Sequence, residues 1–278
     1  MAVFKAGRHT FSLGDRTYVM GILNITPDSF SDGGHFYDPD RALERALEIE
    51  ALGADILDIG AQSTGPSAKL LSDEDELKRL SAFLPVICSE IKIPISVDTF
   101  YPLTARFALE NGVSIINDVS AEINPEIGRL VKDYGAGWII MHNRGGALAT
   151  DTVYEGGVVN AVKSFFNEAA AKTLTLGLEP AQICFDPGIG FGKSMPDNLE
   201  LIRKTADLRT EGYGLLVGVS RKRVIGAATG ETKAEKRDPG TIAAHTVAIA
   251  GGADFIRVHD VGAAVQAAKM ADAIYRRI

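Results

Sequence analysis

Short apolar runs alternate with longer amphipathic segments along most of this chain. The runs are rich in β-branched and apolar residues and are too short for stable helices, whereas the segments between them repeat apolar residues at helical spacing. This alternation is typical of βα units on a parallel sheet. Eight runs are predicted to be strands: residues 18–24, 55–59, 93–98, 114–117, 137–142, 182–185, 215–219 and 255–258.

The segments between these strands are predicted to be helices. Residues 40–52 place Ala42 and Ala46 on one apolar face with charged residues opposite. Capping residues or early prolines predict further helices over residues 74–91, 126–134 and 197–209. Eight repeats without a Pro/Gly/Ser linker predict an α/β fold, a closed (β/α)8 TIM barrel that forms a single domain over residues 1–278.

The segment before Tyr18 has a different pattern. Gly14-Asp15 lies between two β-prone runs and has the composition of a tight turn. We therefore expect a short N-terminal β-hairpin under the floor of the barrel, with its turn at these two residues.

Composition excludes several classes of partner. The formal net charge is -7 and the pI is about 5.3, which argues against binding to nucleic acid or to an anionic membrane. No apolar run is long enough for a signal peptide or a membrane span. Cys88 and Cys184 lie in apolar stretches without metal-binding spacing, so we expect free thiols and a cytoplasmic protein.

Polar residues follow or end every predicted strand. In a parallel barrel these positions converge at one mouth, where βα loops carry the chemistry. Any one of them could simply cap the next helix, but packing alone does not account for all eight, because a buried polar group needs a partner. They are Asn24, Asp58, Asp98, Asn117-Asp118, His142, Asp186, Ser220-Arg221-Lys222, and Arg257 with His259.

These side chains fall into two chemical groups. Carboxylates, an amide and an ammonium at Asp98, Asn117, Asp186 and Lys222 suit the edge of a flat heterocycle, which presents N–H, NH2 and C=O groups. Asn24, Arg257 and His259 suit a phosphate, since a guanidinium holds two phosphate oxygens and an amide can reach an oxygen or a hydrated Mg2+. The mouth is therefore predicted to hold a heterocycle inside and a phosphate nearer the rim.

Six segments also resemble motifs of the dihydropteroate synthase family, in the order in which that family carries them. Residues 20–34, MGILNITPDSFSDGG, are similar to its N-terminal signature almost residue for residue. The others are SVDT at 96–99, INDV at 116–119, DPGIGFGK at 186–193, SRK at 220–222 and RVHD at 257–260.

The resemblance implies the roles of individual residues. It implies a pterin site made of Asp98, Asn117, Asp186, Lys222, Met141 and Phe191, and a diphosphate site made of Asn24, Thr64, Arg257 and His259. It further implies Mg2+ as cofactor, bound at Asn24, and catalytic roles for Asp98, Asp186, Lys222 and Arg257. The implied partners are a pterin methyl diphosphate, 4-aminobenzoate and a second copy of the chain, in a homodimer formed through the last helices.

The implied reaction is loss of diphosphate from the pterin methylene, followed by attack of the arylamine nitrogen on the resulting cation. Residues 26–34 and 62–71 are then expected to be loops that close over the second substrate and exclude water.

One departure from the family pattern keeps alternatives open. The second loop reads Gln62-Ser63-Thr64-Gly65-Pro66-Ser67, where the family usually has Glu-Ser-Thr-Arg-Pro-Gly, so a bidentate phosphate contact is missing at Gly65. A catalytically weakened pterin-binding paralogue is therefore one alternative. The other is a methyl-folate:corrinoid methyltransferase-like barrel, which would not need the Asn24 loop or the Arg257 and His259 phosphate site.

Overall fold

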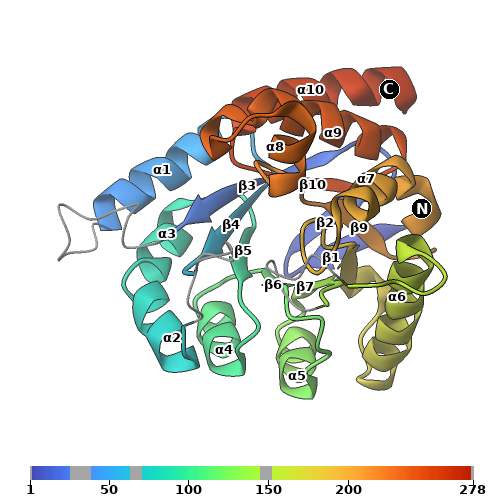
Figure 1. The fold of residues 1–278 in the computed structure, drawn as a ribbon. Helices are drawn as coiled ribbons and strands as arrows, with labels where there is room; N and C mark the ends of the chain where they lie inside the picture. The colour runs from blue at the N-terminus through green and yellow to red at the C-terminus, as the bar shows by residue number, and fades with distance from the viewer. Residues whose placement is uncertain (1, 26–38, 63–70, 145–151, 277–278) are drawn as a thin grey trace.

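The computed structural model describes residues 2–25, 39–62, 71–144 and 152–276. Eight parallel strands close into a barrel in the order β10-β3-β4-β5-β6-β7-β8-β9, and helices surround it (Figure 1). A separate two-stranded antiparallel sheet precedes the barrel. The predicted (β/α)8 barrel with an N-terminal hairpin is confirmed.

The barrel strands lie within about two residues of their predicted bounds. β3 and β10 begin and end at the predicted residues, and the other six shift by one or two residues at one or both ends. Their bounds are β3 Tyr18–Asn24, β4 Ile56–Gly60, β5 Ile95–Asp98, β6 Ile115–Asp118, β7 Gly137–Met141, β8 Ile183–Asp186, β9 Gly214–Val217 and β10 Phe255–Val258.

The α-helices in the described part of the chain follow the strands. They are α1 Pro39–Ala51, α2 Asp73–Ser81, α3 Leu84–Glu90, α4 Pro102–Glu110, α5 Pro125–Asp133, α6 Val158–Thr175, α7 Met195–Arg203, α8 Arg223–Thr229, α9 Asp238–Ala250 and α10 Val261–Tyr275. Short 3-10 helices lie at η1 Pro180–Gln182, η2 Thr205–Leu208 and η3 Ala234–Lys236. Among these described elements, none is both long and apolar enough to cross a bilayer.

Two of the predicted helices were wrong in detail. The helix predicted over 74–91 is α2 followed by α3, because Pro85 lies in the first turn of α3 and has no N–H to continue the preceding helix. The N-cap of α2 is Ser72, whose side chain accepts from the Asp75 N–H. The helix predicted over 197–209 ends at Arg203 and continues only as the 3-10 turn η2.

Inside the barrel, the two-residue period of the strands separates an apolar layer from a polar one. The lower layer consists of buried apolar side chains: Met20, Ile56, Ile115, Ile139, Cys184, Leu216 and Phe255. Two residues further along the same strands lie Ile22, Asp58, Asn117, Met141, Asp186, Gly218 and Arg257. The polar residues therefore share one level, at the carboxyl ends of the strands.

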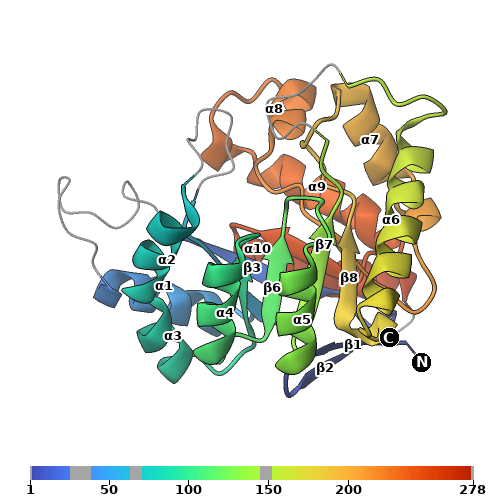
Figure 2. The ribbon, with the colours of Figure 1, turned by 90° about the horizontal axis from the view of Figure 1, so that it is seen from below.

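The N-terminal hairpin closes the lower end of the barrel. β1 (Val3–Ala6) pairs with β2 (His9–Ser12), so its turn is at Gly7-Arg8, and the predicted turn at Gly14-Asp15 instead joins β2 to the barrel. Phe4 and Phe11 of the hairpin pack against Phe255, with ring centroids 5.5 Å away in both cases. Figure 2 shows the hairpin at the opposite end of the molecule from α8.

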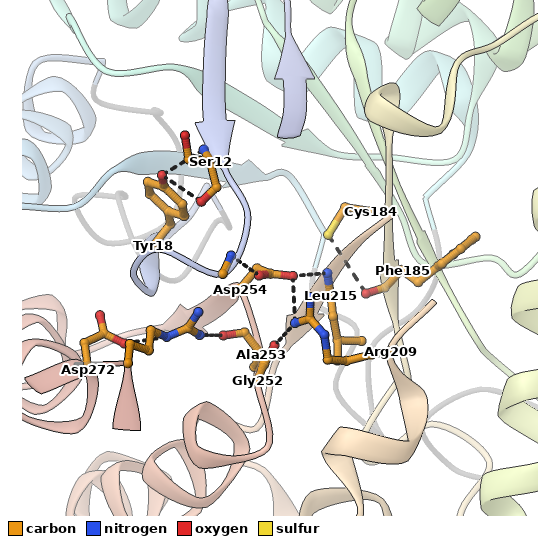
Figure 3. Close-up of polar contacts among 12 residues, drawn as sticks. Ser12, Tyr18, Cys184, Phe185, Arg209, Leu215, Gly252, Ala253, Asp254 and Asp272 are labelled. Atoms are coloured by element: carbon orange, nitrogen blue, oxygen red, sulfur yellow. Dashed lines mark hydrogen bonds and ion pairs between the residues drawn. The ribbon is translucent and has the colours of Figure 1, made fainter. Parts of the chain in front are cut away.

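Asp254 joins several segments at the lower end of the barrel through hydrogen bonds (Figure 3). Its fully buried carboxylate accepts from the Gly14 N–H and the Leu215 N–H, each at 3.0 Å, and lies 3.5 Å from Nη1 of Arg209. It thus links the connection after the hairpin, strand β9 and the segment before β9. Arg209 also donates to the carbonyl of Gly252, beside Asp254.

We expect Asp254→Ala to lower the free energy of unfolding by about 2 to 5 kcal/mol, because the buried N–H of Leu215 and the N–H of Gly14 lose their acceptor and Arg209 loses its carboxylate partner. Urea denaturation measures this loss. Asp260→Ala is the control, since Asp260 only caps the exposed start of α10 and its loss costs about 1 kcal/mol. Equal losses in the two variants would contradict the assigned role of Asp254.

Candidate functional site

The polar layer opens into a cavity of about 510 Å3 at the carboxyl ends of the strands. Its volume lies in the range of small-molecule sites. The cavity is lined by nearly all the residues singled out from the sequence: Asn24, Asp98, Asn117, Met141, Asp186, Phe191, Lys222, Arg257 and His259. Thr64 and Gly65 of the second loop, and residues 26–34 of the first, lie outside the described residues.

Arg257 lies at the centre of the polar layer and joins two carboxylates from different strands. Its Nε donates to Oδ2 of Asp58 at 2.6 Å, and its Nη2 donates to Oδ2 of Asp98 at 2.9 Å. Nδ2 of Asn117 donates to the same oxygen of Asp58 at 3.3 Å. Burial raises the pKa of Asp98, and the positive charge of Arg257 opposes that rise. The guanidinium therefore fixes the carboxylate that faces the cavity.

Two further groups of opposite charge, Asp186 at the end of β8 and Lys222 after β9, also line the cavity. Burial raises the pKa of Asp186, and the charge of Lys222 opposes the rise. Burial lowers the pKa of Lys222 to about 8, and Asp186 opposes this shift. The ammonium lies 4.6 Å from the centre of the Phe191 ring and donates to the carbonyl of Ile189. A flat ligand in the cavity would thus meet an acceptor, a donor and an aromatic face.

The loop after β8 is held in place by a buried cation. Nζ of Lys193 donates to the carbonyls of His142, Gly188 and Phe191 at 3.2, 3.0 and 2.9 Å. Burial lowers the pKa of this ammonium to about 7. Because His142 follows β7, Lys193 hydrogen-bonds to the loops after both β7 and β8. Met141, the last residue of β7, and Phe191, in the loop after β8, line the cavity wall nearby.

His259 lies at the rim as a neutral imidazole. Burial lowers the pKa of His259 to about 4, and the charges of Arg221 and Arg257 add to the shift. Oγ of Ser220 accepts from the His259 backbone N–H at 3.1 Å and lies 2.9 Å from Nδ1 of the ring. The Ser220 hydroxyl can donate to Nδ1 or accept from it, depending on the tautomer of the ring. In either tautomer the neutral ring carries one N–H and adds no positive charge to the rim.

Several cavity residues were not predicted from the sequence. Ile22 could have been found, because it lies two residues before Asn24 on the same strand. Asp58, noted at its strand end without a role, does not line the cavity but bonds Arg257, which does. Glu235 and Arg237 carried no such signal, since they lie in or beside η3, far from any strand end in sequence. Gln62, at the start of the second loop, also lines the wall.

Asn24 is a cavity residue that could hold a metal ion through a side-chain oxygen. Within the described ranges there is no cluster of three His, Cys, Asp or Glu side chains that could hold a metal. Asn24 lines the cavity, and a Cβ at Gly60 would lie 3.5 Å from its Oδ1 and 3.6 Å from Cβ of Asp98, which are ordinary contact distances. One oxygen ligand is typical of Mg2+ that substrate phosphates also bind.

The fold and the cavity define the class of the protein: a barrel enzyme with a deep polar site at the carboxyl ends of its strands, lined by carboxylates, cations and an aromatic ring. The family described as pterin binding enzyme matches residues 20–259, and the chain belongs to this family.

Individual relatives agree in sequence and in structure. The dihydropteroate synthase of Synechocystis is 42% identical over 272 residues, covering 97% of this chain and 94% of the relative. The solved dihydropteroate synthase of Xanthomonas albilineans with 4-aminobenzoic acid is 37% identical, with a TM-score of 0.90 and coverage of 99% of this chain and 98% of its own. That of Thermus thermophilus in complex with 6HMPPP is 36% identical, with a TM-score of 0.84 and coverage of 98% and 100%.

Gly188→Ala is expected to disturb the loop after β8. A Cβ at Gly188 would lie 2.0 Å from the carbonyl oxygen of His142, and φ is +66°, so the loop must move. We expect a loss of about 3 kcal/mol in unfolding free energy together with weaker ligand binding, measured by denaturation and titration calorimetry. Gly112→Ala is the control, with φ of +95° but nothing within 4 Å, and should cost about 1 kcal/mol without changing binding.

Proposed function

We propose that this protein is a dihydropteroate synthase that condenses 6-hydroxymethyl-7,8-dihydropterin diphosphate with 4-aminobenzoate to give 7,8-dihydropteroate and diphosphate. The observation that carries the proposal is the gathering of Asp98, Asn117, Asp186 and Lys222 in one cavity that Asn24, Arg257 and His259 also line. Family membership supports the same reaction.

The reaction exchanges one bond for another at the pterin methylene. The C–O bond breaks, and its electron pair leaves with the diphosphate. The amine nitrogen of 4-aminobenzoate then forms the C–N bond and releases a proton. Since the intermediate is a cation, the protein contributes mainly by stabilising charge and by excluding water.

The carboxylates and cations of the cavity have complementary roles in this proposal. Asp98 and Asp186 accept hydrogen bonds from the pterin and favour the positive charge that grows on it. Lys222 donates to the pterin, and Met141 and Phe191 pack near its ring. Arg257 is the proposed cation between the pterin and the leaving group. Its Nε and Nη2 bond the carboxylates of Asp58 and Asp98, and its side chain is 20% exposed and lines the cavity.

The proposed diphosphate ligands are Asn24, Thr64, Arg257 and His259. His259 binds as a donor, consistent with its low pKa. Mg2+ is proposed as cofactor, with Asn24 as its protein ligand, and when bound it supplies positive charge to the departing diphosphate.

The assembly and location are also proposals. We propose a homodimer through the last helices, supported by exposed apolar side chains there: Val247 on α9 and Met270, Ile274 and Tyr275 on α10. A cytoplasmic location is supported by Cys88 and Cys184, which are both free thiols.

The first test is product formation from the pterin diphosphate and 4-aminobenzoate with Mg2+. We expect turnover in wild type and a loss of about 100-fold or more in kcat/KM for Asp98→Ala, since an aligned charge is removed from the transition state. Asp133→Ala, on the exposed end of α5, is the control and should retain full activity.

Comparing wild type with Gly65→Arg in the same assay distinguishes a synthase from the catalytically weakened paralogue that the glycine at this position suggests. Turnover in wild type establishes the synthase. If wild type binds the pterin but forms product only after arginine is restored at position 65, the chain is a pterin-binding paralogue instead.

Pterin affinity should fall as pH rises through about 8. Lys222 is protonated below its pKa of about 8 and neutral above it, so a charge-assisted hydrogen bond is lost at high pH. We expect the dissociation constant to rise about tenfold between pH 7 and pH 9.5, measured by titration calorimetry. Lys222→Arg keeps its charge in this range and should abolish the rise. A pH-independent wild type would contradict the assigned role of the ammonium.

A further inference from the structure

A buried carboxyl group lies behind the wall of the cavity, outside the set of residues assigned to the reaction. Glu76 on α2 is fully buried. Its Oε1 accepts from Nε2 of Gln62 at 2.9 Å, and its Oε2 accepts from Oγ1 of Thr99 at 2.5 Å. Both donors are neutral. Because an ionised carboxylate without a cation is costly to bury, this arrangement requires an explanation.

One donor lines the cavity, and the other is the chain neighbour of a residue that does. Gln62 lies two residues after β4 and lines the cavity. Thr99 follows Asp98 directly, and Asp98 lines the same cavity. Glu76 therefore joins two parts of the cavity wall that come from neighbouring strands, β4 and β5.

Other contacts from this region strengthen the connection. Oε1 of Gln62 accepts from the Leu71 N–H at 3.2 Å, so its amide oxygen and nitrogen are both used. Nη1 of Arg79, one turn along α2 from Glu76, donates to the carbonyl of Ala61 at 2.6 Å. The hydroxyl of Tyr101 donates to the carbonyl of Leu71 at 2.6 Å. Helix α2 thus contacts Ala61 and Gln62, the two residues that directly follow β4.

The electrostatic surroundings make the amide at position 62 important. Burial raises the pKa of Glu76 to about 7, hydrogen bonds from Thr99, Thr104 and Gln62 oppose the rise, and the charge of Asp73 adds to it. Asp98 and Tyr101 face the same region and interact electrostatically with Glu76. Asp73 and Asp98 thus act on Glu76 as further acids, and a fourth carboxyl group, at position 62, would add repulsion at short range.

We propose that Glu76 is a positioning residue that aligns Gln62 and the end of β5, which carries Asp98. The amide at position 62 is needed for this role, because it donates a hydrogen bond to the Glu76 carboxylate where a carboxylate would repel it. The effect on turnover rests on the proposed synthase function, but the effect on pterin binding does not. A glutamate at position 62 would instead place two carboxyl groups 2.9 Å apart, where they must share a proton.

The test uses Gln62→Glu and the double variant Gln62→Glu/Glu76→Gln. In Gln62→Glu, the shared proton is present at low pH and leaves as pH rises, so the two anions repel and the wall shifts. We expect pterin affinity and kcat/KM to fall at least tenfold more than in wild type between pH 6 and pH 9. The double variant restores an amide–carboxylate pair in reversed order and should return to the wild-type pH profile.

Controls keep the outcome decisive. Glu74→Gln makes the same chemical change on the exposed face of α2 and should follow the wild-type profile. Circular dichroism at both pH values confirms that each variant is folded. A wild-type pH profile in Gln62→Glu, or a folded double variant that stays as pH-sensitive as Gln62→Glu, overturns the positioning role. Wild type that binds pterin without turnover defeats the synthase proposal alone, because the binding profiles still test the pair.

Discussion

The site depends on a balance of buried charges in the upper half of the barrel. Arg257 holds Asp58 and Asp98 through separate nitrogen atoms, and each of the three residues comes from a different strand. Lys222 and Asp186 form a second group of opposite charges nearby. Since an unpaired buried charge costs several kcal/mol, the groups proposed to bind the ligand also stabilise one another in its absence. The cavity is therefore preorganised for a polar ligand.

Such a polar layer is tolerable because the rest of the interior is apolar. The lower layer, closed by Phe4 and Phe11 of the hairpin against Phe255, supplies hydrophobic burial without polar atoms. Asp254 adds hydrogen bonds that fix the floor to β9. Stability and chemistry are thus divided between the two ends of the barrel, as parallel barrels require, because only the carboxyl-end loops converge over a mouth.

The sequence predicted what local patterns encode and missed what depends on partners. All eight barrel strands could be located because a buried strand needs a short apolar run whatever its neighbours are. The hairpin turn was placed at Gly14-Asp15, although the pairing that forms is Val3–Ala6 with His9–Ser12. Two turns were available, and packing of the aromatic rings against the barrel selects between them. The predicted helix over 74–91 ran through Pro85, although a proline lacks the N–H that a helix interior needs. Pro85 instead lies in the first turn of α3, a position that proline favours.

For the site, the sequence by itself determined which residues reach the mouth, because strand ends in a parallel barrel converge wherever Asp98, Asp186 or Arg257 occurs among them. It also determined the family, through motifs read in order. Only the tertiary structure decided which charges pair, that His259 is neutral, and that Gln62 is joined to Glu76. Pairing and pKa depend on distances and burial between segments far apart in sequence, and these are set only when the barrel closes.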